Sequence, residues 1–242
     1  MASRFLDMEI CMTITTDAPL ISASLMCCDP LRLREEIQLL AAAGVDLFHI
    51  DVMDGCFVPN FAMNAPQTAA VHAACPVPAD VHLMVRDPDP YLAMFAEAGA
   101  AVISVHIETC DTPAETLRHI RSLGVLASLA ISPATPLDTV RPLAGLLDML
   151  LVMTVTPGFA GQEIIPDAAA RVNAARRLLD DCDCARTPIE VDGHISTQTA
   201  PELYAAGASV FVAGTAGLFY GDMEYRGHMQ TLRAALQKKR PL

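Results

Sequence analysis

The chain has 242 residues, 52% of them hydrophobic, and a formal net charge of −12. This length and apolar content predict one large globular domain with a filled core, and the strongly negative net charge argues against nucleic acid as a partner. The apolar runs are shorter than the roughly 18 residues of a membrane span, and the N-terminus has no signal-peptide pattern. We therefore expect a soluble cytoplasmic protein without a membrane partner.

Strand-like apolar runs and helix-like segments alternate eight times along the chain. The predicted strands are residues 19–25, 46–52, 79–84, 101–106, 125–131, 147–154, 187–191 and 209–213. The predicted helices are residues 30–43, 64–74, 89–98, 112–123, 136–145, 167–180, 196–206 and 222–239. This alternation predicts an α/β fold, a closed (β/α)8 TIM barrel, with an open doubly wound sheet as the alternative. We expect residues 1–17 to form an N-terminal extension and residues 18–242 a single catalytic domain.

Histidine and aspartate recur where predicted strands end. His49 and Asp51 lie two residues apart in one strand, so their side chains project to the same face. His82 and Asp192 close two other apolar runs. One His or Asp at such a place is usually a packing or turn residue, but a barrel brings these strand ends to one mouth. Two imidazoles and two carboxylates suit a first-row divalent ion with room for substrate oxygens.

Two glycine-rich segments follow the sixth and eighth predicted strands. They are residues 156–161 (TPGFAG) and 213–217 (AGTAG), and residues 193–194 follow the strand between them. Backbone amides in such loops can bind an oxyanion without Lys or Arg, and many barrels bind phosphate at their last strands. The segments together indicate a phosphorylated small molecule.

A divalent ion beside two aspartates and a phosphate pocket suits proton transfer next to a carbonyl. The ion would polarise the carbonyl and its neighbouring hydroxyl and stabilise the enediolate that forms. One aspartate on each face could remove the carbon-bound proton from one side and return a proton to the other. This chemistry inverts a stereocentre.

Four runs of the sequence resemble the ribulose-phosphate 3-epimerase family. They are residues 48–60 (FHIDVMDGCFVPN), 80–85 (DVHLMV), 153–162 (MTVTPGFAGQ) and 189–193 (IEVDG). The resemblance covers about residues 19–235 in unbroken order. It implies a (β/α)8 barrel that interconverts C3 epimers of a phosphorylated ketose with one divalent ion, usually Zn²⁺, Fe²⁺, Mn²⁺ or Co²⁺. By position, it assigns the metal ligands to His49, Asp51, His82 and Asp192, and the catalytic acid/base pair to the two aspartates.

The resemblance also implies substrate contacts. Ser24 matches a substrate-contacting serine at the end of the first strand, and His82 and Asp192 are expected to face the substrate as well. Met53, Met84 and Met153 match apolar residues that line the reacting carbon and limit water there. The phosphate contacts carry over to Gly158, Phe159, Ala160, Gly161, Gly193, His194, Gly214 and Thr215.

Three positions depart from the usual ribulose-phosphate pattern. Ala160, His194 and Thr215 stand where those enzymes typically have glycine, glycine and serine. The allulose-6-phosphate 3-epimerase branch looks closer at residues 24–27 (SLMC), 153–155 (MTV) and 214–219 (GTAGLF). We therefore expect interconversion of D-allulose 6-phosphate and D-fructose 6-phosphate. The main alternative is D-ribulose 5-phosphate and D-xylulose 5-phosphate, and an uncharacterised phosphoketose is a third possibility.

Two hypotheses from other classes stay open. The same barrel could bind a phosphosugar without catalysis, although the two aspartates would then have no purpose. A metal-dependent aldolase would also polarise a carbonyl, but it does not need opposed carboxylates, and carbon–carbon cleavage products would reveal it. As partners we expect the phosphorylated ketose and further copies of the chain in a homo-oligomer.

Overall fold

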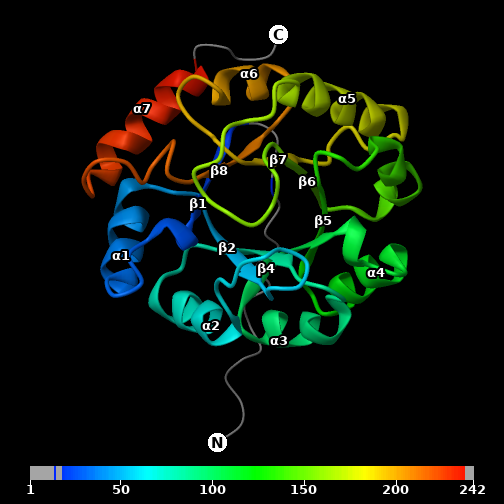
Figure 1. The fold of residues 1–242 in the computed structure, drawn as a ribbon, viewed down its shortest axis with the longest axis horizontal. Coiled ribbons are helices and arrows are strands. Elements are labelled where there is room, and N and C mark those ends of the chain that lie inside the picture. The colour runs from blue at the N-terminus through cyan, green and yellow to red at the C-terminus, as the bar shows by residue number, and fades with distance from the viewer. Residues whose placement is uncertain (1–13, 15–17, 238–242) are drawn as a thin grey trace, which may run out of the picture.

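The structure, a computed structural model, describes residue 14 and residues 18–237. Within these residues, eight parallel strands close into a barrel in sequence order, so the (β/α)8 prediction is confirmed and the open-sheet alternative is wrong. Figure 1 looks along the barrel, with the strands in the centre and the helices around them. The extension predicted for residues 1–17 lies outside the described residues, apart from the buried Ile14.

The strands are β1 (Leu20–Ser24), β2 (Leu47–Met53), β3 (Ala79–Met84), β4 (Ala100–His106), β5 (Leu126–Ile131), β6 (Met149–Met153), β7 (Ile189–Asp192) and β8 (Val210–Ala213). The α-helices are α1 (Leu33–Ala43), α2 (Ala65–Ala74), α3 (Leu92–Glu97), α4 (Pro113–Ser122), α5 (Ala168–Asp181), α6 (Ala200–Ala205) and α7 (Tyr225–Gln237). The described part of the chain also contains four 3₁₀-helices: η1 (Leu25–Cys27), η2 (Asp89–Tyr91), η3 (Ile107–Thr109) and η4 (Leu137–Leu146). None of the described helices is long and apolar enough to cross a membrane.

The predicted strand bounds agree with the observed ones to within two residues. The helices predicted at 64–74, 112–123 and 167–180 agree to within one residue at each end, whereas the other helix predictions need correction. The segment predicted as a helix at 136–145 is the 3₁₀-helix η4, which contains Pro142. Proline lacks the N–H of a regular helical hydrogen bond and clashes with the preceding turn, which favours the tighter form. The other helices begin three or more residues later than predicted: α1 at Leu33, α3 at Leu92 after the 3₁₀-helix η2, α6 at Ala200 and α7 at Tyr225.

Alternation along the strands separates the two faces of the barrel wall. In β2, Phe48, Ile50 and Val52 belong to the main hydrophobic core, together with helix residues such as Leu40 and Val71. The alternate side chains of a strand point the other way, into the barrel. At the N-terminal end of the strands the interior is apolar, with Leu20, Leu47, Val102, Leu126, Met149 and Val210 in one cluster.

Toward the C-terminal ends of the strands the interior becomes polar. The next inward positions form a fully buried polar layer of Ser22, His49, Asp80, Ser104, Ser128 and Glu190. Above this layer come Ser24, Asp51, His82, His106 and Asp192, each at or near the end of its strand. The fold thus collects the titratable side chains at the C-terminal mouth, where barrels of this type carry their chemistry.

Candidate active site

The four predicted metal ligands meet at the barrel mouth. His49 Nε2 lies 3.3 Å from His82 Nδ1. Asp51 Oδ1 lies 3.4 Å from that His49 nitrogen and 3.5 Å from that His82 nitrogen. Asp192 Oδ2 lies 3.9 and 3.8 Å from the same two nitrogens. Barrel closure therefore brings the Asp192 side chain of β7 close to the side chains of β2 and β3, across the barrel interior.

This donor set fits a divalent ion. Ligand atoms bound at about 2.0–2.1 Å around a tetrahedral ion lie about 3.3–3.4 Å from one another, close to the spacings observed. All four ligand atoms lie within 4.8 Å of one another. Two imidazole nitrogens with two carboxylate oxygens suit Zn²⁺ or another first-row divalent ion. The four side chains can therefore hold a metal with little movement.

The two aspartates have different electrostatic surroundings. Burial opposes ionisation of Asp51, but the rings of His49 and His82 hold its pKa well below the ordinary value. Burial raises the pKa of Asp192 to about 7 against the opposing effect of His49, and the nearby Asp51 and Asp80 carboxylates add to the rise. Burial also opposes a charge on His49, yet Asp51 and Asp80 raise its pKa well above the ordinary value. A bound metal would replace that imidazole proton, because a ligating nitrogen must be free of hydrogen.

The far nitrogens of both histidines have their own partners. His49 Nδ1 lies 2.7 Å from Asp80 Oδ2, and Glu190 Oε1 is 3.7 Å away. His82 Nε2 lies 2.9 Å from His106 Nε2. Metal-bound histidines usually have such a partner, which sets the tautomer and the ring orientation. The sequence analysis missed these supporting residues, although Asp80 and Glu190 each lie two residues before a predicted ligand and so share its strand face.

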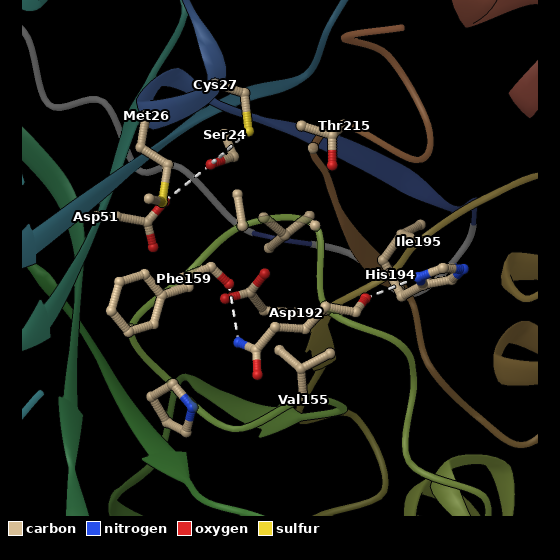
Figure 2. A pocket seen from close by; sticks show the side chains of 18 of the residues that line it. Ser24, Met26, Cys27, Asp51, Val155, Phe159, Asp192, His194, Ile195 and Thr215 are labelled. Atoms are coloured by element: carbon tan, nitrogen blue, oxygen red, sulfur yellow. Dashed lines mark hydrogen bonds between the residues drawn. The ribbon is translucent and has the colours of Figure 1, made fainter. Parts of the chain in front are cut away.

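The substrate residues expected from the resemblance surround one cavity of about 580 Å³, counting its open mouth. Ser24, the three methionines and all eight predicted phosphate contacts line it, whereas the ring of His82 is buried and does not. Figure 2 shows Asp51 and Asp192 reaching into the cavity from different strands. Ser24 Oγ donates a 2.8 Å hydrogen bond to Asp51 Oδ2. Among the described residues, no Lys or Arg lines the cavity.

The β6–α5 loop is tied down by side chains that donate to its carbonyl oxygens. Gln162 Nε2 donates to the carbonyls of Thr156 and Phe159, at 2.6 and 2.9 Å. Asn60 Nδ2 donates to the carbonyl of Gly158 at 2.7 Å. His194 Nδ1 lies 2.8 Å from the Gln162 carbonyl, so this nitrogen carries the hydrogen. In Figure 2 the His194 ring is turned toward that carbonyl and away from Asp51. With these carbonyls occupied, the loop amides are the polar groups left for an anion.

Residues 20–219 match the profile of the Ribulose-phosphate 3 epimerase family. The chain belongs to this family. Proteins named ribulose-phosphate 3-epimerase are similar to it over almost their whole length. The one from Bacillus subtilis (strain 168) is 37% identical over 215 residues, which are 89% of this chain and 98% of the relative. The one from Rhodobacter capsulatus is 39% identical over 222 residues, 90% of this chain and 95% of the relative. The protein is thus an isomerase, as its residues predicted.

Solved structures of other phosphosugar enzymes share the fold. The 3-keto-L-gulonate-6-phosphate decarboxylase of Vibrio cholerae superposes with a TM-score of 0.72, covering 93% of this chain and all of that one, at 16% identity. The 3-hexulose-6-phosphate synthase of Salmonella typhimurium gives a TM-score of 0.60 at 18% identity, covering 91% of this chain and 99% of that one. At such identities the likeness concerns the barrel alone.

Several cavity residues of this epimerase-family chain were not predicted. The most polar are Cys27 and Gln162, which line the cavity beside the predicted contacts. Burial and the Asp51 carboxylate raise the pKa of the Cys27 thiol to about 11, which favours its neutral form. Gln162 ends the sequence run 153–162 and lies in the β6–α5 loop. A side-chain amide directly after a glycine-rich segment could have indicated a hydrogen bond back to the loop.

Proposed function

We propose that this protein interconverts D-ribulose 5-phosphate and D-xylulose 5-phosphate by epimerisation at C3. The observation that carries the proposal is the cluster of two aspartates and two imidazoles at the barrel mouth, whose aspartates face a cavity that three glycine-containing loops also line. The names of the similar proteins from Bacillus subtilis and Rhodobacter capsulatus support the five-carbon substrate over the six-carbon one that the sequence favoured.

Asp51 and Asp192 are the proposed acid/base pair. In one direction, the ionised carboxylate takes the proton from C3 of the ketose, and the C3 electron pair moves into the planar enediolate. The protonated carboxyl then gives its proton to the opposite face of C3, which yields the epimer. The two carboxyls have exchanged protonation states, so the reverse reaction uses them in the opposite order. Ser24 holds one oxygen of Asp51 and so fixes the direction from which this carboxylate approaches.

His49, His82, Asp51 and Asp192 are the residues that would hold the divalent ion. Bound there, the ion supplies Lewis acidity that lowers the cost of the negative charge developing on the substrate oxygens. Met53, Met84 and Met153 line the same cavity and are 5%, 2% and 1% exposed. Their side chains exclude water from the reacting carbon, which favours return of a proton by the carboxyl instead of by solvent.

The three glycine-containing loops are the proposed phosphate site. The cavity has no cation among its described lining residues, so backbone amides of the β6–α5, β7–α6 and β8–α7 loops supply the hydrogen bonds. The side chains of Ala160, His194 and Thr215 alter this site relative to the glycines and serine of the usual pattern. A hexulose phosphate is therefore the second candidate substrate, and it should be tested beside the pentulose phosphate.

Deuterium exchange tests the proposal. Zn²⁺- or Mn²⁺-loaded protein should convert D-ribulose 5-phosphate to D-xylulose 5-phosphate in deuterated water with deuterium entering only at C3. The kcat/KM for D-ribulose 5-phosphate would then be compared with that for D-allulose 6-phosphate and D-fructose 6-phosphate. The comparison would show whether the preferred ketose has five or six carbons. Binding without exchange would support the non-catalytic barrel, and carbon–carbon cleavage products would support the aldolase; either result would refute the proposal.

A further inference from the structure

A row of three side chains runs from the proposed metal site toward the rim of the barrel. His82 on β3 and His106 at the end of β4 are both fully buried, and their Nε2 atoms are 2.9 Å apart. His106 Nδ1 lies 3.0 Å from Glu108 Oε2 on η3. The two rings are inclined by only 25°, with centroids 5.0 Å apart. Nearly coplanar rings touching by their edges are what an in-plane N–H to N hydrogen bond requires.

The positions of the protons in this row follow from its two ends. At one end, His82 Nδ1 faces the ligand set and must be free of hydrogen to bind a metal. The His82 hydrogen is then on Nε2 and is donated to His106 Nε2. His106 consequently carries its own hydrogen on Nδ1 and donates it to the Glu108 carboxylate at the other end. Only this order gives both the His82–His106 and the His106–Glu108 contacts one donor and one acceptor when Glu108 is ionised.

Glu108 is itself held in place. Its Oε1 accepts hydrogen bonds from the Ser132 amide and the Thr135 hydroxyl, at 2.8 and 2.5 Å, in the segment after β5. Arg171 on α5 donates to the carbonyl oxygens of Ser132 and Thr135, at 2.8 and 2.7 Å. The carboxylate is thus an anchored acceptor, and the row connects a proposed metal ligand to α5 on the outside of the barrel.

We infer that His106 and Glu108 are positioning residues that hold His82 in the tautomer and orientation required for metal binding. The inference rests on the proposed metal-dependent function and extends it to residues that touch neither the metal nor the substrate. Removing a partner of this kind weakens metal binding by about 10–100-fold. In contrast, a residue that only fills space would leave metal affinity unchanged once the protein is folded.

Zn²⁺ affinity, measured by competition with a chromophoric chelator, tests this without any assay of turnover. His106→Leu should weaken binding by about 10–100-fold, because its side chain cannot accept from His82. His106→Gln should recover part of the loss, since its amide oxygen can accept the Nε2 hydrogen. Ser104→Ala is the matched control: it changes a buried side chain on the same strand that makes no hydrogen bond in the structure. Unchanged affinity in folded His106→Leu would overturn the inference.

The role of Glu108 as the acceptor at the end of the row can be tested in the same assay. Glu108→Leu should weaken Zn²⁺ binding, whereas Thr135→Val removes only one hydrogen bond to Glu108 and should leave the affinity near that of the parent. Equal effects of the two variants would mean that the loop, and not the row, determines metal binding.

The inference can also be tested on the unmodified protein, in case the variants do not fold. In Zn²⁺-loaded protein with ¹⁵N-labelled histidine, ring nitrogen shifts should report the Nε2–H tautomer for His82 and the Nδ1–H tautomer for His106. An Nε2–H or doubly protonated His106 would overturn the proposed order. If the parent binds no metal, the proposed function fails; if His106→Leu binds metal as the parent does, only the positioning role fails.

Discussion

Asn60 Nδ2 on the β2–α2 loop donates a 2.7 Å hydrogen bond to the carbonyl oxygen of Gly158 on the β6–α5 loop, joining residues 98 positions apart. Val58 lies beside the same glycine, and a Cβ built on Gly158 would come within 3.1 Å of it. The β2 strand that ends in the proposed ligands is thereby coupled to the proposed phosphate loop. A shift of the loop after β2 would therefore also move the β6–α5 loop, so the proposed metal and phosphate sites are structurally linked.

Asn60→Ala should raise KM for the phosphoketose more than it lowers kcat. The lost neutral hydrogen bond contributes about 0.5–1.5 kcal/mol, which predicts a change in KM of roughly 2–13-fold. Steady-state kinetics would measure KM and kcat separately, with Asn173→Ala on α5, which does not line the cavity, as control. An unchanged KM would mean that the loop keeps its shape without this contact.

Asp51→Asn and Asp192→Asn keep the side-chain shape but remove proton transfer. Each should lower kcat by about 10²–10⁴-fold, with any loss of metal added to this effect. Metal content and circular dichroism must be measured alongside, to separate chemistry from loading and folding. Near-normal turnover in either variant contradicts the two-base assignment.

Removal of the metal should abolish turnover. Dialysis against a strong chelator is expected to leave a folded but inactive protein, and Mn²⁺, Zn²⁺, Co²⁺ or Fe²⁺ should restore activity because the N₂O₂ donor set accepts each of them. Activity and bound metal should be measured together while the ion is added back to the metal-free protein, and the two should rise in parallel. Full activity in metal-free protein would exclude the proposed mechanism.

Gly161→Ala tests the phosphate loop with a matched control. Gly161 has φ +79° and Gly124 at the end of α4 has φ +78°, and neither position crowds a new Cβ, which at Gly161 would meet only Thr215 Oγ1 at 4.0 Å. Both alanine variants should therefore lose similar stability through backbone strain. Only Gly161→Ala should raise KM for the phosphoketose. Equal KM values in the two variants would count against phosphate binding by this loop.

The unfolding free energy should fall as the pH decreases through the range in which Glu108 is protonated. Burial opposes ionisation of Glu108, but hydrogen bonds from His106 and Thr135 lower its pKa from 4.5 to about 2. A lowered folded-state pKa stabilises the protein above pH 4.5, and this contribution disappears between about pH 4.5 and pH 2. Urea unfolding above and within this window should show a smaller pH dependence for Glu108→Gln than for the parent. Identical dependences would show that the carboxylate is not held by these contacts.

The sequence was sufficient for the barrel and for much of the proposed site. Strand alternation placed His49 and Asp51 on one face, and repeated strand–helix units predicted the closed fold that the structure has. The prediction of a regular helix at 136–145 was wrong because periodicity was read without the proline at 142. The sequence also favoured a six-carbon substrate, whereas the similar proteins are named for ribulose phosphate.

Only the tertiary structure revealed what supports the proposed site. The contacts of His82 with His106 and of His49 with Asp80 depend on strand register, and the Asn60 and His194 ties depend on how distant loops meet above the barrel. Side-chain direction within a strand repeats every two residues and can be read locally. Pairing between strands and loops is set by barrel closure over the whole chain, so no local pattern encodes it.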